Sequence, residues 1–471
     1  ALGFADPAGA LRHIGALTGG VSRTAAIQRT LLPALLPEFA DAPEPDRGLL
    51  AYRQVSEKLG RTPWYLRLLR DSGPVAIRLA RLLGESRYVT DLLGRDPESL
   101  RMLSNDAELA PRRPEALGEA MSSAVRRQDR PADAVAALRA LRRRELFRIA
   151  SADLLGMIDV SEVGRALSDV TDAVLAATLR VAMSDTGAPS DLRFTLIGMG
   201  RLGGAEMSYA SDADVLFVYE GDGAAAHAVA ERLRGLLAAP APDPPLPIDA
   251  GLRPEGRQGP LVRSLAAYRS YYGRWSRIWE SQALLRARFV AGDADLGRQF
   301  LEIVDPLRYP KGGLNREQVV EILRIKARVD AERLPRGADP ATHTKLGRGG
   351  LTDVEWTVQL LQLRCAGTLP ALRTTGTLDA LAAIVDGDLL TEDEGGALRA
   401  AWWLASEIRD AMMLVRGRPS DQLPRQGVEL AGVVRALGWS GDDPGEFVDE
   451  YLRTARRARQ VVTERMGAEV P

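Results

Sequence analysis

The stretch Phe194-Thr-Leu-Ile-Gly-Met-Gly-Arg-Leu-Gly-Gly-Ala-Glu-Met-Ser-Tyr-Ala-Ser-Asp-Ala-Asp-Val-Leu-Phe-Val-Tyr219 decides the fold at the centre of the chain. It begins and ends with short runs, Phe194–Ile197 and Val215–Tyr219, whose residues favour β-strands. A glycine-rich segment joins the two runs. Because side chains at positions i and i+2 of a strand face the same way, Asp212 and Asp214 are predicted to project together at the start of the second strand.

Two neighbouring carboxylates repel each other unless a cation lies between them. Mg²⁺ prefers such oxygen ligands and often completes its shell with substrate phosphates. We therefore expect a magnesium site at this pair. A turn at Gly203 and Gly204 would bring backbone N–H groups close to phosphate, and Ser211 would add a hydroxyl donor. The predicted third carboxylate is Asp249, in the later extended segment Pro247-Ile-Asp-Ala-Gly-Leu-Arg-Pro254.

A dinucleotide-binding site is the first alternative, because Gly198-x-Gly200-x-x-Gly203 matches the glycine fingerprint of such sites. A Rossmann unit would next need a sizeable helix, another strand and an acidic residue at the end of that strand. Here the strand that carries the two aspartates follows only nine residues after Gly203, which disfavours this fold. Isolated Asp-x-Asp and Gly-Gly pairs also occur in ordinary exposed turns. Their conjunction with a third aspartate favours the metal site.

The sequence on both sides of this centre is predicted to be helical. Apolar residues recur at spacings of three and four up to about residue 185, and again from about residue 268 to the end. A chain of 471 residues is also too long for one compact core. We expect a mostly α-helical α+β fold in which a small sheet lies between helical regions. The predicted domains are residues 1–135, 136–300 and 301–471.

Composition narrows the classes of partner. The formal net charge is −1, so no general basic field favours binding of nucleic acid. No apolar run approaches the roughly 20 residues needed to span a bilayer, so we expect no membrane association. The single cysteine, Cys365, fits a reducing, cytoplasmic setting. The first residues have no initiating Met and do not resemble a signal peptide, so the chain is expected to be part of a longer protein.

The full motif resembles a known family. Gly198-Met-Gly-Arg-Leu-Gly-Gly-x-Glu-Met-x-Tyr-x-Ser-Asp-x-Asp214 is similar to the sequence of the glutamine synthetase adenylyltransferase/adenylyl-removing enzymes, within the DNA polymerase β-like nucleotidyltransferase superfamily. Three more blocks, 249–262, 279–288 and 345–356, are similar to later segments of that family. Together the blocks cover roughly residues 135–420. The resemblance implies that the small sheet is a polymerase β-like nucleotidyltransferase sheet.

Enzymes of this family contain two such units. The N-terminal unit removes AMP from glutamine synthetase by phosphorolysis, and the C-terminal unit attaches it. Thr352 precedes Asp353 here, as in the attaching half, whereas the removing half tends to carry Arg. The resemblance thus implies ATP as the substrate and Mg²⁺ held by Asp212, Asp214 and Asp249 as the cofactor. It implies glutamine synthetase as the protein partner, and a PII-type signalling protein is a further candidate partner.

Other residues of the matched blocks allow both a functional and a structural interpretation. Arg253 and Lys345 are candidate contacts to nucleotide phosphates, although an arginine can equally form a structural ion pair. Glu206 is expected to support either the glycine turn or the metal site. Thr352-x-x-Glu355 matches a capping box, which we favour over a catalytic role. Gly251 departs from the polar residue that is usual in the family.

The sequence leaves three alternatives to adenylylation open. The same site can catalyse the opposite reaction, phosphorolytic removal of AMP from glutamine synthetase. A related nucleotidyltransferase can act on a small molecule or an RNA end, although the near-neutral charge argues mildly for a protein substrate. A non-catalytic helical scaffold with a degenerate domain is disfavoured, because all three aspartates are present.

Overall fold

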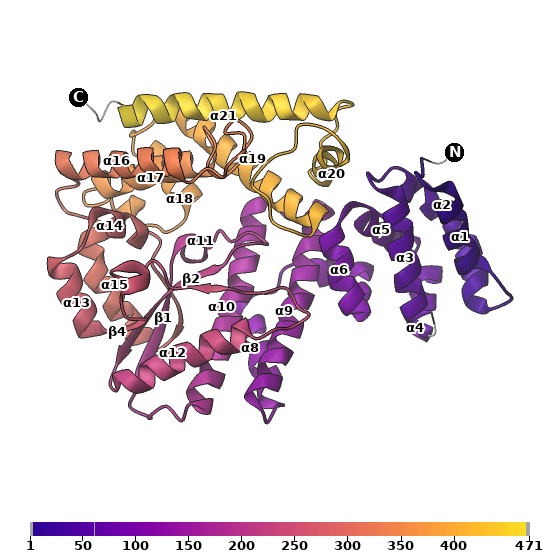
Figure 1. Ribbon diagram of the computed structural model, residues 1–471, viewed down its shortest axis with the longest axis horizontal. Helices are drawn as coiled ribbons and strands as arrows, with labels where there is room; N and C mark the ends of the chain where they lie inside the picture. The colour runs from indigo at the N-terminus through magenta and orange to yellow at the C-terminus, as the bar shows by residue number, and fades with distance from the viewer. Residues whose placement is uncertain (1–2, 61, 468–471) are drawn as a thin grey trace. The chain divides into compact units, whose positions relative to one another are not determined.

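The computed structural model describes residues 3–60 and 62–467 (Figure 1). The chain forms two compact units. Unit 1 consists of Ala1–Pro111, Arg143–Val160 and Glu407–Asp449, and unit 2 consists of Arg112–Arg142, Ser161–Ser406 and Glu450–Pro471. Four of the five divisions fall inside helices and one falls in the loop at Pro111, and each unit combines segments that are far apart in the sequence. The three domains expected from the sequence remain a prediction.

The described part of unit 1 is helical. It contains α1 (Pro7–Thr18), α2 (Arg23–Ala40), α3 (Pro45–Leu59), α4 (Pro63–Asp71), α5 (Gly73–Glu85), α6 (Arg87–Arg95), η1 (Pro97–Ser104), α7 (Asp106–Leu109) and α20 (Val428–Ala436), with parts of α9 (Pro131–Leu154), α19 (Glu392–Arg416) and α21 (Pro444–Gly467). Several of these helices have a proline in the first turn, where its missing N–H costs no hydrogen bond.

Contacts across unit 1 join its distant segments. Ser86 accepts a hydrogen bond from Val89 N at 3.0 Å, which caps α6, and its hydroxyl donates to Leu414 O at 2.7 Å. The buried carboxylate of Glu85 pairs with Arg435 at 2.7 Å. Buried polar groups need such partners, because an unpaired one costs about 1–3 kcal/mol. These bonds therefore tie α19 and α20 to the N-terminal helices.

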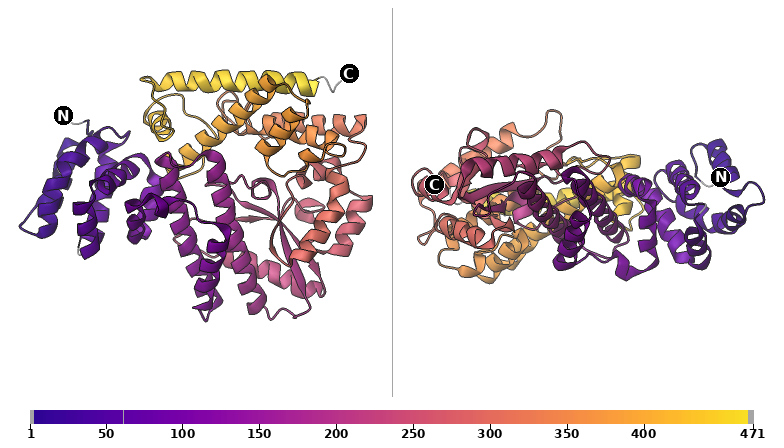
Figure 2. Two further views of the ribbon diagram at one scale, coloured as in Figure 1. Left: turned by 180° about the vertical axis from the view of Figure 1, so that it is seen from behind. Right: turned by 90° about the horizontal axis from the view of Figure 1, so that it is seen from below.

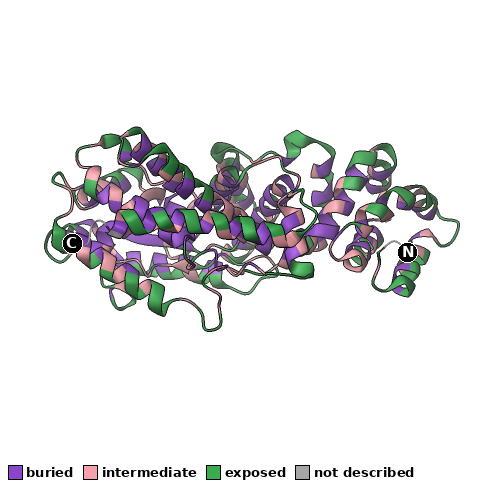
Figure 3. Cartoon of the chain, turned by 90° about the horizontal axis from the view of Figure 1, so that it is seen from above, coloured by how far each residue is buried: buried purple, intermediate pink, exposed green. Residues whose placement is uncertain are grey.

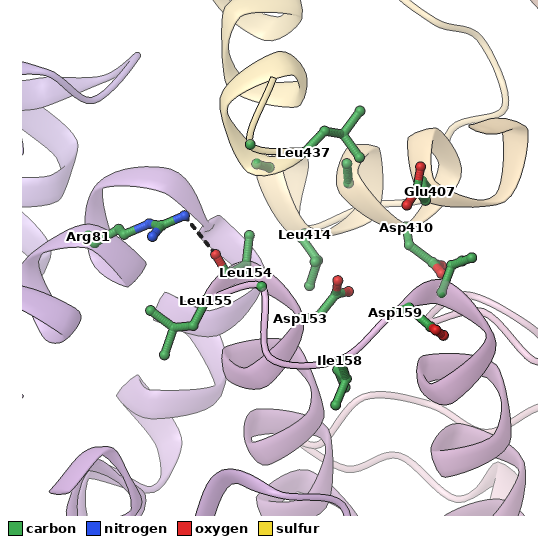
Figure 4. A pocket seen from close by; sticks show the side chains of 15 residues that line it. Arg81, Asp153, Leu154, Leu155, Ile158, Asp159, Glu407, Asp410, Leu414 and Leu437 are labelled. Carbon is green, nitrogen blue, oxygen red and sulfur yellow. Dashed lines mark hydrogen bonds between the residues drawn. The ribbon is translucent and has the colours of Figure 1, made fainter. Parts of the chain in front are cut away.

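A pocket lies within unit 1 where α9 ends and α10 (Val160–Asp185) begins (Figure 4). Carboxylates from these helix ends and from α19 point into it: Asp153, Asp159, Glu407 and Asp410. Arg81 also lines the pocket and donates to Leu154 O at 2.9 Å. Apolar side chains such as Leu155, Ile158 and Leu414 complete the lining, so the pocket is acidic with apolar walls.

Unit 2 contains the sheet. Its strands are β1 (Arg193–Gly198), β2 (Ala213–Glu220), β3 (Ile248–Asp249), β4 (Val262–Ser264) and β5 (Arg288–Gly292). Its helices, besides parts of α9, α10, α19 and α21, are α8 (Pro114–Arg126), α11 (Gly200–Gly203), α12 (Gly223–Ala238), η2 (Gly256–Gln258), α13 (Leu265–Arg274), α14 (Ile278–Leu284), α15 (Ala294–Arg308), α16 (Arg316–Glu332), α17 (Leu351–Cys365), η3 (Pro370–Leu372) and α18 (Thr377–Asp386).

The sheet is mixed, with strand order β3-β2-β1-β5. β1 pairs antiparallel with β2 and with β5, in a register that places Gly198 opposite Val215. The other edge of β2 pairs in parallel with β3 and, further along, with β4. The expectation of a mostly helical α+β fold with a small sheet is therefore confirmed. The topology also places the glycine-rich segment after β1 and the segment after β3 at opposite edges of β2.

One face of the sheet packs against helices α13, α14 and α15, which lie along it in Figures 1 and 2. Alternate residues supply this face, including Ile197 in β1 and Leu216 and Val218 in β2. They meet Tyr268 of α13 and Phe300 of α15, whose rings lie edge to face with centroids 5.0 Å apart. Burial of these large side chains stabilises the position of β2, the strand that begins at the predicted site.

The last helix, α21, also has a buried face and an exposed face, with the buried residues at helical spacing. In Figure 3 it lies nearest the viewer, and buried positions alternate with exposed ones along it. Ala455, Ala458 and Val462 are buried, whereas Arg456 and Arg457 are exposed. Gly349 lies so close to this helix that a Cβ there would stand 1.9 Å from Ala455 O. Among the described residues, no helix is both long and apolar enough to cross a membrane.

Candidate active site

Three aspartates from two neighbouring strands come together at one edge of the sheet. Asp212 immediately precedes β2, Asp214 is its second residue, and the β2–β3 register places Asp214 beside Asp249. One carboxylate oxygen from each of the three lies within 4.8 Å of the others. The structure therefore brings together the three residues that the sequence pattern selected. Their role as metal ligands stays a prediction.

The electrostatics of this cluster favour a cation. Burial, reinforced by repulsion from Asp212 and Asp249, raises the pKa of Asp214 to about 7. The positive charge of Lys345 acts in the opposite direction, which places this lysine near enough to influence the cluster. A raised pKa means that the three negative charges are costly together, and a divalent cation would remove that cost. The donor set is oxygen only, as Mg²⁺ requires.

Asp249 is held in place by the segment that follows it. Its Oδ1 accepts a hydrogen bond from Gly251 N at 2.6 Å, and its Oδ2 lies 3.4 Å from the guanidinium of Arg257. A Cβ on Gly251 would stand 2.8 Å from the same Oδ1. The glycine that departs from the family pattern therefore leaves space beside the carboxylate, since a larger residue would crowd Oδ1.

Gly200 is a site residue that sequence reasoning missed. Its φ is +53°, and a Cβ at this position would lie 2.3 Å from Asp214 Oδ2. Only glycine fits both the left-handed backbone and the approach of the carboxylate. Gly200 is visible in the sequence as the second glycine of Gly198-x-Gly200, but there it was considered only as part of a dinucleotide-binding pattern.

Gly203 and Gly204 are buried, and their neighbour explains why they are glycines. A Cβ on Gly203 would stand 1.8 Å from Arg286 O, and one on Gly204 would stand 2.2 Å from Arg286 Nη1. Their N–H groups donate to Met199 O and Gly200 O, at 2.8 and 3.1 Å, inside the α11 turn. The two glycines thus allow close packing. That their turn meets nucleotide phosphates stays a prediction, and these two N–H groups are already used within it.

A buried ion pair lies beneath the glycine turn. Arg286 Nη1 lies 2.7 Å from Glu206 Oε2 and donates to Thr375 O at 2.8 Å, while Nη2 donates to the hydroxyl of Thr377. Glu206 also accepts hydrogen bonds from the N–H and the hydroxyl of Thr377. Of the two expectations for Glu206, this arrangement matches support of the turn. Arg286 was missed as a site residue because its partners are distant in sequence.

Ser211 and Arg253 mainly stabilise their own loops. The Ser211 hydroxyl accepts a hydrogen bond from Ser208 N at 3.0 Å. The Arg253 guanidinium donates to three backbone oxygens, Gly259 O at 3.0 Å, Ala250 O at 2.8 Å and Arg257 O at 3.0 Å. These bonds hold the loop that follows the third carboxylate. A phosphate contact by either residue remains a prediction.

The segment before α17 does not form the expected capping box. The N-cap residue is Gly350, and no side chain caps this end through the Thr352 pattern. Instead, Asp353 Oδ2 accepts a hydrogen bond from Gly349 N at 2.7 Å. The capping prediction was therefore wrong, because α17 begins at Leu351 and Thr352 lies inside its first turn, not at the N-cap.

Asp353 is part of a buried ion cluster. Its oxygens lie 2.6 Å from Lys326 Nζ and 2.9 Å from Arg459 Nη1. Burial alone would raise the pKa of Asp353, but these two cations and the Gly349 N–H hold it below its usual value. The cluster joins α16, α17 and α21. Asp353 therefore has a structural role, whereas Lys345, eight residues earlier, is exposed and acts on Asp214.

The fold and the site define the class of protein. Two carboxylates at the start of one strand, a third on the neighbouring strand and a glycine turn after the strand on the other side form the arrangement of polymerase β-like nucleotidyltransferases. A family model described as glutamate-ammonia ligase adenylyltransferase matches residues 76–303. A second, described as GlnD PII-uridylyltransferase, matches residues 324–465.

Curated relatives extend the similarity over almost the whole chain. Proteins named bifunctional glutamine synthetase adenylyltransferase/adenylyl-removing enzyme are 54% identical in Nocardia farcinica and in Streptomyces coelicolor, and 52% identical in Mycolicibacterium smegmatis. The alignments cover 98–99% of this chain and 48–49% of the relatives. The chain thus spans about half the length of the curated relatives it matches. Over its own length, it belongs to the glutamine synthetase adenylyltransferase/adenylyl-removing family.

Proposed function

We propose that this chain transfers AMP from ATP to a tyrosine hydroxyl of glutamine synthetase. The observation that carries the proposal is the meeting of Asp212, Asp214 and Asp249 at one edge of β2, with the α11 turn at the other. The names of the relatives supply the acceptor protein. Thr352, which resembles the attaching half of the family, supports this direction of the reaction.

The three carboxylates would hold Mg²⁺, which when bound supplies positive charge that stabilises the entering and leaving oxygens. The tyrosine oxygen forms a bond to the α-phosphorus of ATP, and the bond from that phosphorus to the bridging oxygen breaks, releasing pyrophosphate. A tyrosine hydroxyl has a pKa of about 10 and must lose its proton on the way. Asp249, on β3 at the edge of β2 away from the α11 turn, would accept it.

Lys345 and the α11 turn would orient the nucleotide. Lys345 carries a positive charge close enough to act on Asp214, so a phosphate bound between them would meet a cation on one side. Gly203 and Gly204 fix the path of the turn by packing on Arg286. Holding reactants in line is the main contribution a protein makes to phosphoryl-type transfer. These residues therefore act by position.

The test is transfer of labelled AMP from ATP to unmodified glutamine synthetase by the parent chain and by Asp212→Asn. We expect the variant to lose at least about 100-fold in rate, the scale on which one electrostatic stabiliser acts. Because Asp212 is exposed, its thermal unfolding should match that of the parent. Asp191→Asn, an exposed aspartate before β1, is the control and should keep full activity. Near-normal transfer by Asp212→Asn would contradict the assignment.

The opposite reaction is the second candidate, because the relatives' name also includes adenylyl removal. Incubation of adenylylated glutamine synthetase with phosphate, followed by release of ADP, measures it directly. Rapid release of ADP without AMP transfer from ATP would reverse the assigned direction while leaving the site intact.

We also propose a PII-type signalling protein as a regulator and a cytoplasmic location. The match of residues 324–465 to a PII-uridylyltransferase model supports a regulatory role of this helical segment. Titration of the chain with a PII-type protein, followed by the rate of AMP transfer, tests the first proposal. An unchanged rate and no binding would contradict it. Fractionation of cells tests the second.

A further inference from the structure

An aromatic groove lies in unit 2 beside the loop that follows β3. Its lining includes Tyr271, Trp275 and Trp279, at the junction of α13 and α14, together with Gly256 and Gln258. Trp275 is 70% exposed, although its ring is the largest apolar surface a residue can offer. Exposed tryptophans and tyrosines gathered in a concave surface are typical of the centres of protein interfaces.

Tyr271, one of the three aromatic residues of the groove, is held by its neighbours. Tyr271 donates a hydrogen bond to Glu280 Oε1 at 3.1 Å, and Glu280 Oε2 accepts one from Arg277 N at 2.8 Å, which starts α14. Glu280 itself is buried. The guanidinium of Arg263 lies 5.1 Å from the centre of the Tyr271 ring. A side chain fixed in this way loses little conformational entropy when a partner binds, which favours the use of Tyr271 for recognition.

The groove adjoins the third carboxylate. Gly256 and Gln258 flank Arg257, whose guanidinium lies 3.4 Å from Asp249 Oδ2. The loop follows β3, at the edge of β2 opposite to the one that leads into the α11 turn. If phosphates bind at the turn, then the groove is on the side from which an acceptor must reach the α-phosphorus. A nucleotide base would be expected on the other side.

The rim of the groove is basic. The side chain of Arg257 is 84% exposed, and Arg274 and Arg277 are exposed on either side of Trp275. The one acidic residue in the lining, Glu255, pairs with Arg263. The positive charge around the groove contrasts with the net charge of the whole chain, which is −1. The local charge is therefore complementary to an acidic segment.

We propose that the aromatic groove binds an acidic polypeptide segment of the protein acceptor, the segment that carries the modified hydroxyl. Apolar side chains of the segment pack on Trp275 and Trp279, its carboxylates pair with the exposed arginines, and its hydroxyl reaches Asp249. This inference rests on the proposed function, because it assumes a protein acceptor. It adds the location of the acceptor and its charge.

Steady-state AMP transfer by the whole chain tests this inference, with the concentrations of glutamine synthetase and of Mg-ATP varied separately. Trp275→Ala and Arg277→Glu should each raise the KM for glutamine synthetase about tenfold or more and leave the KM for ATP within twofold. The Arg277→Glu effect should shrink at high salt, because exposed charges are screened. Val428→Ala and Arg328→Glu change an exposed apolar and an exposed basic residue elsewhere and should change neither constant.

The outcomes separate the two proposals. If the parent chain transfers no AMP, the proposed function fails. If the parent is active and Trp275→Ala keeps the parental KM for glutamine synthetase, the groove inference fails alone. A rise in the KM for ATP without a change for the acceptor would assign the groove to the nucleotide and also overturn the inference. Thermal unfolding at the parental temperature shows that the exposed substitutions leave the fold intact.

Discussion

Gly203→Ala offers the sharpest test of how the site is built. The added Cβ would stand 1.8 Å from Arg286 O and 2.7 Å from Gly198 O, both of them backbone atoms. Carbon and oxygen atoms of neighbouring chains normally approach to about 3.3 Å, so the turn must move by about 1.5 Å away from Arg286. Because backbone lies on both sides, no rotation of a flexible side chain can relieve the contact.

That displacement has two measurable consequences. Overpacking of this kind destabilises a fold by about 1–3 kcal/mol, which unit 2 should survive. A 1 Å misplacement of a reacting group can cost about 100-fold in rate, so AMP transfer should fall by at least that factor. Thermal unfolding and initial rates under saturating ATP measure the two effects separately.

The control is Gly235→Ala in α12, where a Cβ would meet no atom within 4 Å. Alanine in the middle of a helix is favoured over glycine by about 1 kcal/mol, so this variant should be slightly more stable and fully active. If Gly203→Ala keeps more than half of the parental rate, then close packing of the turn on Arg286 is not what fixes the site.

Two further variants test charges near the site. Asp353→Asn should lower the stability of the chain by about 1–3 kcal/mol at neutral pH, because Arg459 loses a carboxylate partner and the buried Lys326 loses one of the two carboxylates that flank it, Asp353 and Asp330. The exposed Asp386→Asn should have no such effect. Because the pKa of Asp353 is lower in the folded chain than in the unfolded chain, its ionised carboxylate stabilises the fold fully at pH values above the usual aspartate pKa. The parent chain should lose its stability advantage over Asp353→Asn as the pH falls through the lowered pKa. A difference in unfolding midpoint between the two that stays constant at acid pH would contradict this reasoning. Lys345→Met should raise the KM for Mg-ATP roughly tenfold, because a cation that acts on Asp214 is lost. The control, Lys311→Met, changes another exposed lysine and should leave this KM unchanged. Equal KM values for the two variants would remove Lys345 from the site.

Local patterns were sufficient for part of this architecture. Alternation along β2 predicted that Asp212 and Asp214 lie together, and the proline-rich approach to Asp249 still left a two-residue strand able to pair. Strand periodicity and the runs of helical spacing likewise predicted the small sheet among helices. These features depend on neighbours within a few residues, which a single sequence displays directly.

Other features depend on contacts that no local pattern contains. Gly203 and Gly204 were read as phosphate-binding glycines, but their packing partner, Arg286, lies more than 80 residues later. The Thr352 pattern predicted a capping box, but α17 begins after Gly350, next to the point where Gly349 packs on Ala455 of α21, so Thr352 lies inside the helix. Gly200 could be interpreted only once the position of the Asp214 carboxylate was known.

The ion pair beneath the glycine turn also bears on how this region could evolve. Arg286 lies inside the segment matched by one family model, whereas Thr375 and Thr377 lie inside the segment matched by the other. A gene fragment that encoded the sheet alone would produce a buried guanidinium deprived of two of its acceptors. Recombination between these segments would therefore be selected against, and the sheet and the helices after it should be inherited as one piece.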